Sequence, residues 1–195
     1  MAILMLKMKR GAFPALASPQ AIGDGEPAYG IRLIVDPKDN DVSVLDDAML
    51  EAAVAKWKED GPSILKMLIS NKKVCFEHGP YLSAKTGKPY SGFEGMFNLG
   101  TRTPTTKPKP TVFNKFGEPV TILSEIEQTI YSGSYVNAKV EIWAQDNSFG
   151  RRINCSLLGV MFAADGDSFG GGAAPAAAGD FADMAVQPAD AESVL

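Results

Sequence analysis

The sequence predicts a mainly β fold, a small barrel or sandwich with one helical insertion and a separate C-terminal tail. From Asn71 onward, short aromatic runs are punctuated by Gly and Pro, which is typical of strands joined by turns. Apolar residues recur at helical spacing only between the second strand and Asn71. After Ala164 the composition changes to Gly, Ala and acids. Because strand and helix units do not alternate, a parallel α/β sheet is not expected.

The N-terminal part is expected to supply two strands and the helical insertion. Apolar and basic residues alternate from Ile3 to Phe13, which predicts a strand that ends at Pro14. The expected elements that follow are a Pro- and Gly-rich loop over residues 14–28, a strand over Tyr29–Val35, a helix near residues 45–59 and a second short helix after Pro62.

The rest of the body is expected to be β structure without a further helix. The predicted strands are 74–77, 92–100, 111–114, 135–145 and 152–163. In the segment 135–145, small and branched apolar residues alternate with a set that includes Lys139 and Trp143. One face of this strand is therefore expected to lie in the core, and Trp143 to face outward.

Composition and cysteine content limit the class of protein. Hydrophobic residues make up 45% of the chain and charged residues 22%, values typical of a globular protein with a real core. No apolar run is long enough to span a bilayer, and Met1–Leu6 is too short for a signal-peptide core. Two cysteines, Cys75 and Cys155, suit a reducing compartment. We expect a cytoplasmic protein with no membrane partner.

Charge separates the chain into two regions, which we expect to be a folded domain over residues 1–164 and a disordered acidic tail over residues 165–195. The tail has six acids and no Lys or Arg, whereas Lys66 to Lys115 contains nine basic residues and two acids. A basic stretch of this kind favours a polyanionic partner, and the tail is a natural internal competitor for the same surface. A solvated basic loop with a solubilising tail is the plain alternative.

Aromatic residues interleave with the basic ones, which is the combination that a single nucleic-acid strand requires. Cations neutralise the phosphates, and flat rings stack on unpaired bases. The Pro-rich run from Arg102 to Pro110 carries hydroxyls and cations, which suits a loop that holds a nucleic-acid backbone. The candidate DNA-binding residues are Lys72, Lys73, Lys85, Lys88, Tyr90, Phe93, Arg102, Lys107, Lys109, Lys115, Tyr131, Tyr135, Lys139, Trp143, Arg151 and Arg152.

Several segments together resemble the single-stranded DNA-binding proteins of tailed bacteriophages. They are Tyr90–Phe97, Lys109–Val112, the block Tyr131–Ala138 with its Tyr-x-Gly-x-Tyr-Val-Asn pattern, Trp143 with Asp146, Asn147 and Gly150, and Leu157 and Leu158 before Asp165 and Gly166. The resemblance covers roughly residues 70 to 170. It implies an OB-fold, a five-stranded barrel whose groove binds single strands, and an acidic tail that occupies the groove or recruits replication and recombination proteins. The tail departs from the family in ending Ser193, Val194 and Leu195, without a terminal aromatic residue.

The leading hypothesis is a binding protein without catalysis, cofactor or metal, a monomer or homodimer acting in replication, recombination and repair in the cytoplasm of the infected host. His78 is the single histidine, and no nucleophile motif accompanies it. Cys75 and His78 have zinc-ligand spacing, but only Cys155 remains as a third soft ligand. The alternative hypotheses are a phage structural or protein-interaction β domain and a nucleotide-processing enzyme.

Overall fold

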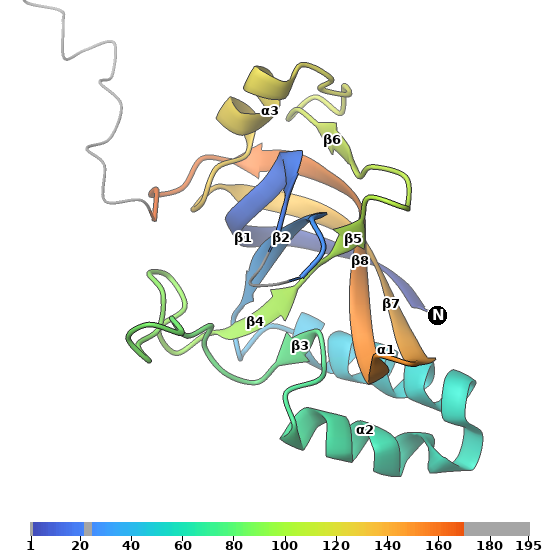
Figure 1. Cartoon of the computed structure of the whole chain (residues 1–195). Coiled ribbons are helices and arrows are strands. Elements are labelled where there is room, and N and C mark those ends of the chain that lie inside the picture. Colours follow the sequence, from blue (N-terminus) through green and yellow to red (C-terminus); the bar gives the residue numbers. More distant parts are fainter. Residues whose placement is uncertain (1, 22–24, 170–195) are drawn as a thin grey trace, which may run out of the picture.

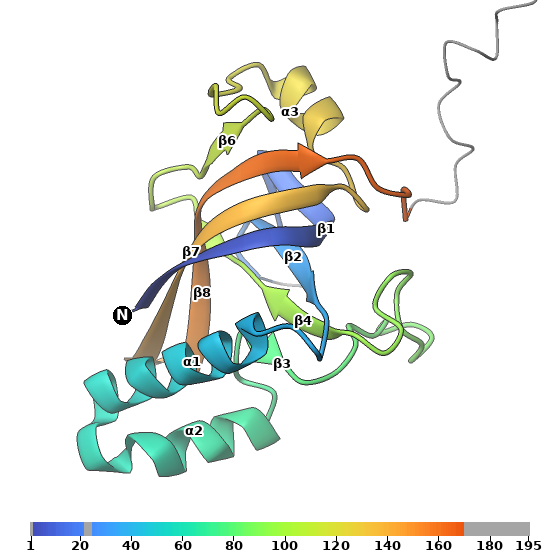
Figure 2. The same ribbon diagram turned by 180° about the vertical axis from the view of Figure 1, so that it is seen from behind.

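The computed structural model describes residues 2–21 and 25–169, which form one strongly curved β sheet with helices at both ends (Figures 1 and 2). The elements of these residues are β1 (Ala2–Gln20), β2 (Ala28–Val35), α1 (Asp41–Trp57), a 3-10 turn (Lys58–Asp60), α2 (Gly61–Ser70), β3 (Phe76–Glu77), β4 (Phe97–Gly100), β5 (Thr103–Pro104), β6 (Thr111–Phe113), α3 (Leu123–Thr129), β7 (Tyr135–Asn147) and β8 (Gly150–Ala164). The fold is mainly β with a helical insertion, as predicted. Among the described helices, none is long and apolar enough to cross a membrane.

The long first strand joins the two halves of the sheet, whose order is β3-β4-β2-β1-β7-β8-β6, with β5 added to β2. The first half of β1 pairs antiparallel with β7, from Ala2 opposite Ile142 to Arg10 opposite Tyr135. Its second half pairs antiparallel with β2, starting at Arg10 opposite Ile34. Because one strand serves both halves, the sheet curls round toward itself.

The two halves also meet between β5 and β8, but through isolated hydrogen bonds and not a ladder. The backbone N–H of Arg102 donates to the carbonyl of Cys155 at 2.8 Å. The Thr103 hydroxyl donates to the Leu157 carbonyl at 2.8 Å and accepts from the Leu157 N–H at 2.9 Å. The expected five-stranded barrel is therefore a partly open one, built from β1, β2, β4 with β5, β7 and β8, an arrangement that the OB-fold shares.

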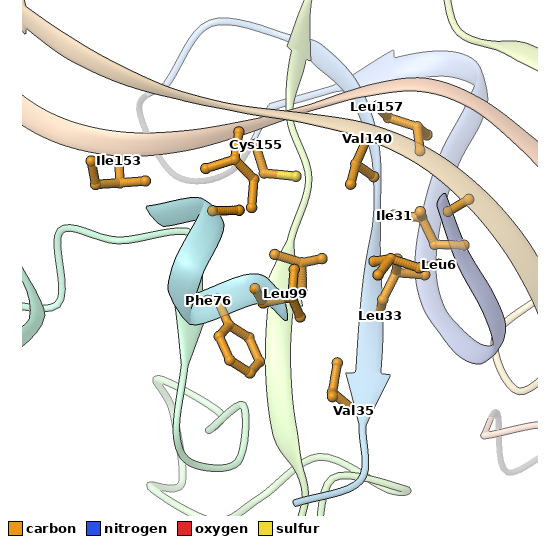
Figure 3. Packing of buried hydrophobic residues seen from close by; sticks show 14 of the residues in the cluster. Leu6, Ile31, Leu33, Val35, Phe76, Leu99, Val140, Ile153, Cys155 and Leu157 are labelled. Atoms are coloured by element: carbon orange, nitrogen blue, oxygen red, sulfur yellow. The ribbon is translucent and has the colours of Figure 1, made fainter. Parts of the chain in front are cut away.

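Alternation along β7 fills the interior as its sequence predicts. Val136, Ala138, Val140 and Ile142 are fully buried. They belong to the same buried cluster as Leu6 of β1 and Ile31 and Leu33 of β2, and Figure 3 shows Val140 and Leu157 of β8 in this cluster. Full burial of one such side chain stabilises the fold by about 1.5–3 kcal/mol.

The helical insertion covers one end of the barrel, and a buried lysine ties its start to β1. α1 and α2 lie side by side below the sheet near the β7–β8 turn (Figure 1). Lys9 is only 5% exposed, and its Nζ forms ion pairs with Asp39 and with Asp41, the latter at 2.7 Å. Burial alone lowers the pKa of Lys9, but the hydrogen bonds and charges of the two carboxylates outweigh it, so the pKa is raised.

Two predictions about elements are wrong. Residues 14–20 continue β1 where a loop was expected, because register shifts between Ala12 and Ala15 and between Ala15 and Gln20 accommodate the prolines. A helix, α3, follows residue 71 where none was expected; its seven residues bury only Ile126 and so carry no helical periodicity. The strands expected at 74–77 and 92–100 are shorter, covering only Phe76–Glu77 and Phe97–Gly100.

The tail that we expect to begin after residue 164 lies only partly within the described residues. Residues 165–169 are described and contact the body of the protein. The prediction of disorder for residues 170–195 lies outside the described residues.

Candidate nucleic-acid interface

A groove of about 230 Å³ runs over the outer face of β2, beside the segment that links β4 to β5. We call it the β2 groove. Four aromatic side chains and two arginines line it, together with small backbone positions: Phe13, Tyr29, Tyr81, Tyr90, Arg32 and Arg102, with Gly30 and Gly100. A Cβ added at Gly30 would lie 2.3 Å from the Thr101 carbonyl oxygen, so only glycine allows the two segments to approach this closely.

Three of the rings pack against one another at the edge of the β2 groove. Tyr81 and Tyr90 stack with centroids 5.2 Å apart, and the Phe13 ring lies at a steep angle to both, with centroid distances of 5.9 and 4.9 Å. The Phe13 side chain is 48% exposed, whereas Tyr81 and Tyr90 are partly buried. A ring that is already packed on one side and half exposed offers a stacking surface that loses little side-chain entropy when a base binds.

Backbone strain in β1 accompanies the exposure of Phe13. Its φ is +51°, in the left-handed region that a phenylalanine rarely adopts, and it sits within the register shift between Ala12 and Ala15. The Phe13 N–H donates to the Ser132 hydroxyl at 2.9 Å instead of to a strand partner. Strain of this kind concentrates at functional positions, because the surrounding structure must hold it in place.

Cations contact the rings of the β2 groove directly. The Arg32 guanidinium lies 3.6 Å from the centre of the Tyr81 ring and also donates to the Asn98 side-chain oxygen. Burial lowers the pKa of Arg32, yet an arginine stays protonated in proteins. Lys109 lies over the Tyr29 ring at 5.3 Å and donates to the Ala17 carbonyl at 3.1 Å.

The Pro-rich loop 104–110 connects this groove to the outward-facing tryptophan of β7. Lys107, two residues before Lys109, lies 4.8 Å from the centre of the Trp143 ring. The Trp143 indole N–H donates to the Ser156 hydroxyl at 3.0 Å, which fixes the ring on the outer face of β7 and β8. Phosphates passing along the loop would meet cations already held over aromatic rings.

Residues 165–169 form a strap across one end of the β2 groove. The Phe169 ring lies under the Arg10 guanidinium at 4.3 Å, and its backbone N–H donates to the Ser132 carbonyl at 3.0 Å. Arg10 also donates to the Asp167 carbonyl at 2.6 Å. A hollow shared by Phe13, Tyr90 and Phe169 makes the strap continuous with the β2 groove.

Two predicted tyrosines hold this strap in place. The Tyr131 hydroxyl lies 3.0 Å from both Asp165 Oδ1 and the Gly166 carbonyl, and it accepts from the Gly166 N–H at 3.1 Å. Desolvation and the adjacent Asp165 carboxylate raise the pKa of Tyr131. The Tyr135 ring lies 5.6 Å from the Arg10 guanidinium.

Eleven of the sixteen predicted site residues fall into three groups. Tyr90 and Arg102 line the β2 groove, and Lys109 reaches its Tyr29. Lys85 and Lys88 lie exposed on the 79–95 loop that carries Tyr81 and Tyr90. Six lie elsewhere: Lys72, Lys73, Arg151 and Arg152 near the helical end, Lys115 in the turn after β6, and Lys139 on the outer face of β7. The structure does not bring this last group to the β2 groove.

Phe93 requires a correction. Its side chain is fully buried in a small cluster with Ala12 and Ile34, beneath Tyr81 and Tyr90. A ring without exposed surface cannot stack on a base, so Phe93 supports the groove and does not line it. Phe13, which is 48% exposed, offers the surface that Phe93 lacks.

The predicted set omits Phe13, Tyr29, Arg10 and Arg32. All four precede the basic stretch from Lys66 to Lys115, in which most of the predicted residues lie. Arg32 carries a signal, since it is a lone charge within the apolar strand β2. The exposure of Phe13 depends on backbone geometry that composition does not reveal. Across the described ranges, no three His, Cys, Asp or Glu side chains gather as a metal site.

Comparison with known proteins points to one family. The family model described as Enterobacter phage Enc34, ssDNA-binding protein, matches residues 2–192. A curated relative, "Putative protein p50" of Acyrthosiphon pisum secondary endosymbiont phage 1, is 31% identical over 173 residues and covers 87% of each chain. The structure of the single-stranded DNA-binding protein of bacteriophage Enc34 in complex with ssDNA aligns with a TM-score of 0.69 at 25% identity, over 86% of this chain and 89% of that one.

A more distant structure shares the fold. The protein gp2.5, a single-stranded DNA-binding protein encoded by bacteriophage T7, aligns with a TM-score of 0.53 at 16% identity over 96% of both chains. At this identity the similarity concerns the fold alone.

Proposed function

The chain belongs to the family of the Enterobacter phage Enc34 single-stranded DNA-binding protein, and we propose on this premise that it binds single-stranded DNA without sequence preference in phage replication, recombination and repair. The observation that carries the proposal is the β2 groove, where Arg32 and Lys109 lie over aromatic rings and Phe13 presents a free face. Stacking on rings is sequence-tolerant because every base has a flat face.

The strand is proposed to enter between the 79–95 loop and the Pro-rich loop 104–110. Tyr90, Phe13 and Tyr29 stack on bases, while Arg102, Lys109, Lys85 and Lys88 neutralise phosphates. Lys107 and Trp143 extend the path onto the outer face of β7 and β8. No chemical step is required of the protein: it covers exposed strands in the cytoplasm of the infected host, as a monomer or homodimer.

The acidic tail is proposed to oppose DNA electrostatically and to contact replication or recombination proteins. Residues 165–195 carry six acids and no basic residue. Carboxylates tethered beside a cationic groove compete with phosphates at a high effective concentration. The strap supports this role because it fixes the start of the tail at the end of the β2 groove.

A titration of labelled oligothymidine, followed by fluorescence anisotropy over a range of salt concentrations, tests the proposal. We expect tight binding whose logarithm falls linearly with the logarithm of salt concentration, at about −0.7 per phosphate neutralised. A matched hairpin duplex should bind more weakly, because its bases are already stacked. Absence of binding at low salt would instead favour a protein-interaction domain.

A further inference from the structure

The outer face of β1, β7, β8 and β6 carries an apolar trough of about 600 Å³. Its lining includes Met5, Phe113, Leu158 and Met161, and none of its lining residues is shared with the β2 groove. Met5 is 57% exposed and Leu158 37%. An apolar hollow lined by exposed methionine and leucine side chains offers a contact surface for another segment.

The charges around the trough specify the character of its occupant. Lys7 and Lys139 line it, and no Asp or Glu is among the lining residues. An occupant that suits both features combines apolar side chains with carboxylates. Nucleic acid is a poor match, since the phosphates would find cations but the bases would find no aromatic pair such as Tyr81 and Tyr90.

The tail of the same chain contains a segment with this composition. Residues 180–186 read Asp-Phe-Ala-Asp-Met-Ala-Val, and Phe181 is the only aromatic residue after Phe169. The ten residues 170–179 precede it; fully extended they reach about 33–36 Å. Phe169, at the end of the strap, is eight residues beyond Met161 of the trough and so lies at most about 26–29 Å from it. The segment can therefore reach the trough of its own molecule.

We propose that residues 180–186 dock in this trough intramolecularly, with Phe181 and Met184 on the apolar surface and Asp180 and Asp183 beside Lys7 and Lys139. This goes beyond DNA binding and does not depend on it. While the segment is docked, Asp180 and Asp183 lie away from the β2 groove, and they compete with DNA there only when the segment is released. It also gives Lys139 a role other than contact with DNA.

Methionine methyl NMR of the full chain tests the docking, because the methionines lie at informative places. Met5 and Met161 report on the trough, Met96 packs against the aromatic cluster of the β2 groove, and Met67 is exposed on α2. In the variant Phe181→Ser/Met184→Ser we expect the Met5 and Met161 signals to shift, with Met96 and Met67 unchanged. The control Ala176→Ser/Ala178→Ser, in the same tail, should shift none of them.

The complementary variant changes the trough. Leu158→Ser, at an exposed position, should move the Met184 signal toward that of a methionine in a free peptide. Unshifted Met5 and Met161 signals in the tail variant would overturn the proposal. So would a shift confined to Met96, which places the segment in the β2 groove, or shifts that vanish on dilution, which assign the trough to the tail of a second copy.

Discussion

Phe13 shows how one strained residue can create a binding surface. Its left-handed backbone turns the ring out of the strand, against the edges of Tyr81 and Tyr90. Phe93, below the same tyrosines, has no exposed surface and serves as support. In the proposed interface, Phe13 therefore stacks on a base and Phe93 supports the tyrosines from below.

Removing the stacking rings should weaken DNA binding. We expect Phe13→Ala or Tyr90→Ala to reduce affinity for oligothymidine by about 1–3 kcal/mol each, because each ring stacks on one base. Phe116→Ala is the matched control, since Phe116 is 76% exposed but lies outside the β2 groove. Fluorescence anisotropy measures the three variants side by side. Equal affinity in all three variants would show that the Phe13 and Tyr90 rings are not part of the interface.

The sequence identifies part of this site and misses another part for a physical reason. Tyr90, Arg102 and Lys109 are found because cations and rings cluster visibly around them. Phe13 and Tyr29 are missed because their position depends on the register shift in β1 and on its pairing with β2, far away in sequence. Phe93 is fully buried and Phe13 is 48% exposed, and the composition of a sequence does not show this difference.

At the scale of elements, the Pro-rich loop 104–110 joins two surfaces that would otherwise be separate. Lys107 contacts Trp143 on β7, and Lys109 contacts Tyr29 on β2. The loop also follows β5, which meets β8 through Thr103. A strand bound along the loop would pass from the groove to the outer face of β7.

Tryptophan fluorescence tests whether DNA follows this loop. Trp143 is held beside Lys107, whereas Trp57 donates to Asp146 at 2.7 Å near the helical end. Oligothymidine should quench Trp143 and spare Trp57. We therefore expect quenching to be lost in Trp143→Phe and retained in Trp57→Phe. The reverse pattern would place the strand near the helical insertion.

The anchor between β1 and α1 predicts a specific pH dependence. The hydrogen bond from Lys9 lowers the pKa of Asp39. A carboxylate with a lowered pKa stabilises the fold above the unfolded value of about 3.9, and this contribution is lost as the pH falls through the folded value. Lys9, with a raised pKa, contributes below about 10.4, and its contribution is lost as the pH rises through the folded value.

Urea unfolding across pH measures this anchor. Lys9→Met should lower the free energy of unfolding at neutral pH by about 1–3 kcal/mol, because two carboxylates lose their charged partner. The deficit should shrink as the pH falls below about 3.9, where Asp39 becomes protonated in the unfolded chain, and should be lost below the lowered pKa of Asp39 in the folded protein. Lys38→Met, at a neighbouring exposed lysine, serves as the control. A deficit independent of pH would show that Lys9 acts through packing alone.

Elements with strong alternation were predictable, and those fixed by tertiary contacts were not. β7 follows its sequence pattern closely, because one face is buried along most of its length. The end of β1 and the short helix α3 depend on partners that are distant in sequence. The local sequence pattern therefore did not predict either element. The same dependence separates the predicted cations, which lie together in sequence but on different parts of the barrel.

In the whole molecule, a basic stretch in the middle of the chain is followed by an acidic tail. Arg102 of the basic stretch lines the β2 groove and Lys109 reaches its Tyr29, and the tail after residue 164 carries six acids. The strap connects the acidic tail to the body of the protein, since Arg10 contacts both Phe169 and Asp167. Gly133 permits this contact, because a Cβ there would lie 2.1 Å from the Asp167 carbonyl oxygen.

Removal of the tail should tighten DNA binding. We expect a chain that ends at residue 169, which keeps the strap and loses four of the six acids, to bind oligothymidine more tightly at low salt. The difference should narrow at high salt, because screening weakens the competition. Anisotropy titrations at two salt concentrations compare it with the full chain. Weaker binding after truncation would contradict the competing role.

Photo-cross-linking with oligothymidine followed by peptide mapping locates the bound strand on the protein. For a strand in the β2 groove we expect cross-links to peptides that contain Phe13, Tyr29, Tyr81 or Tyr90, all of which line the groove. Cross-links confined to the helical end, around Lys72 or Arg152, with none from these four residues, would contradict it.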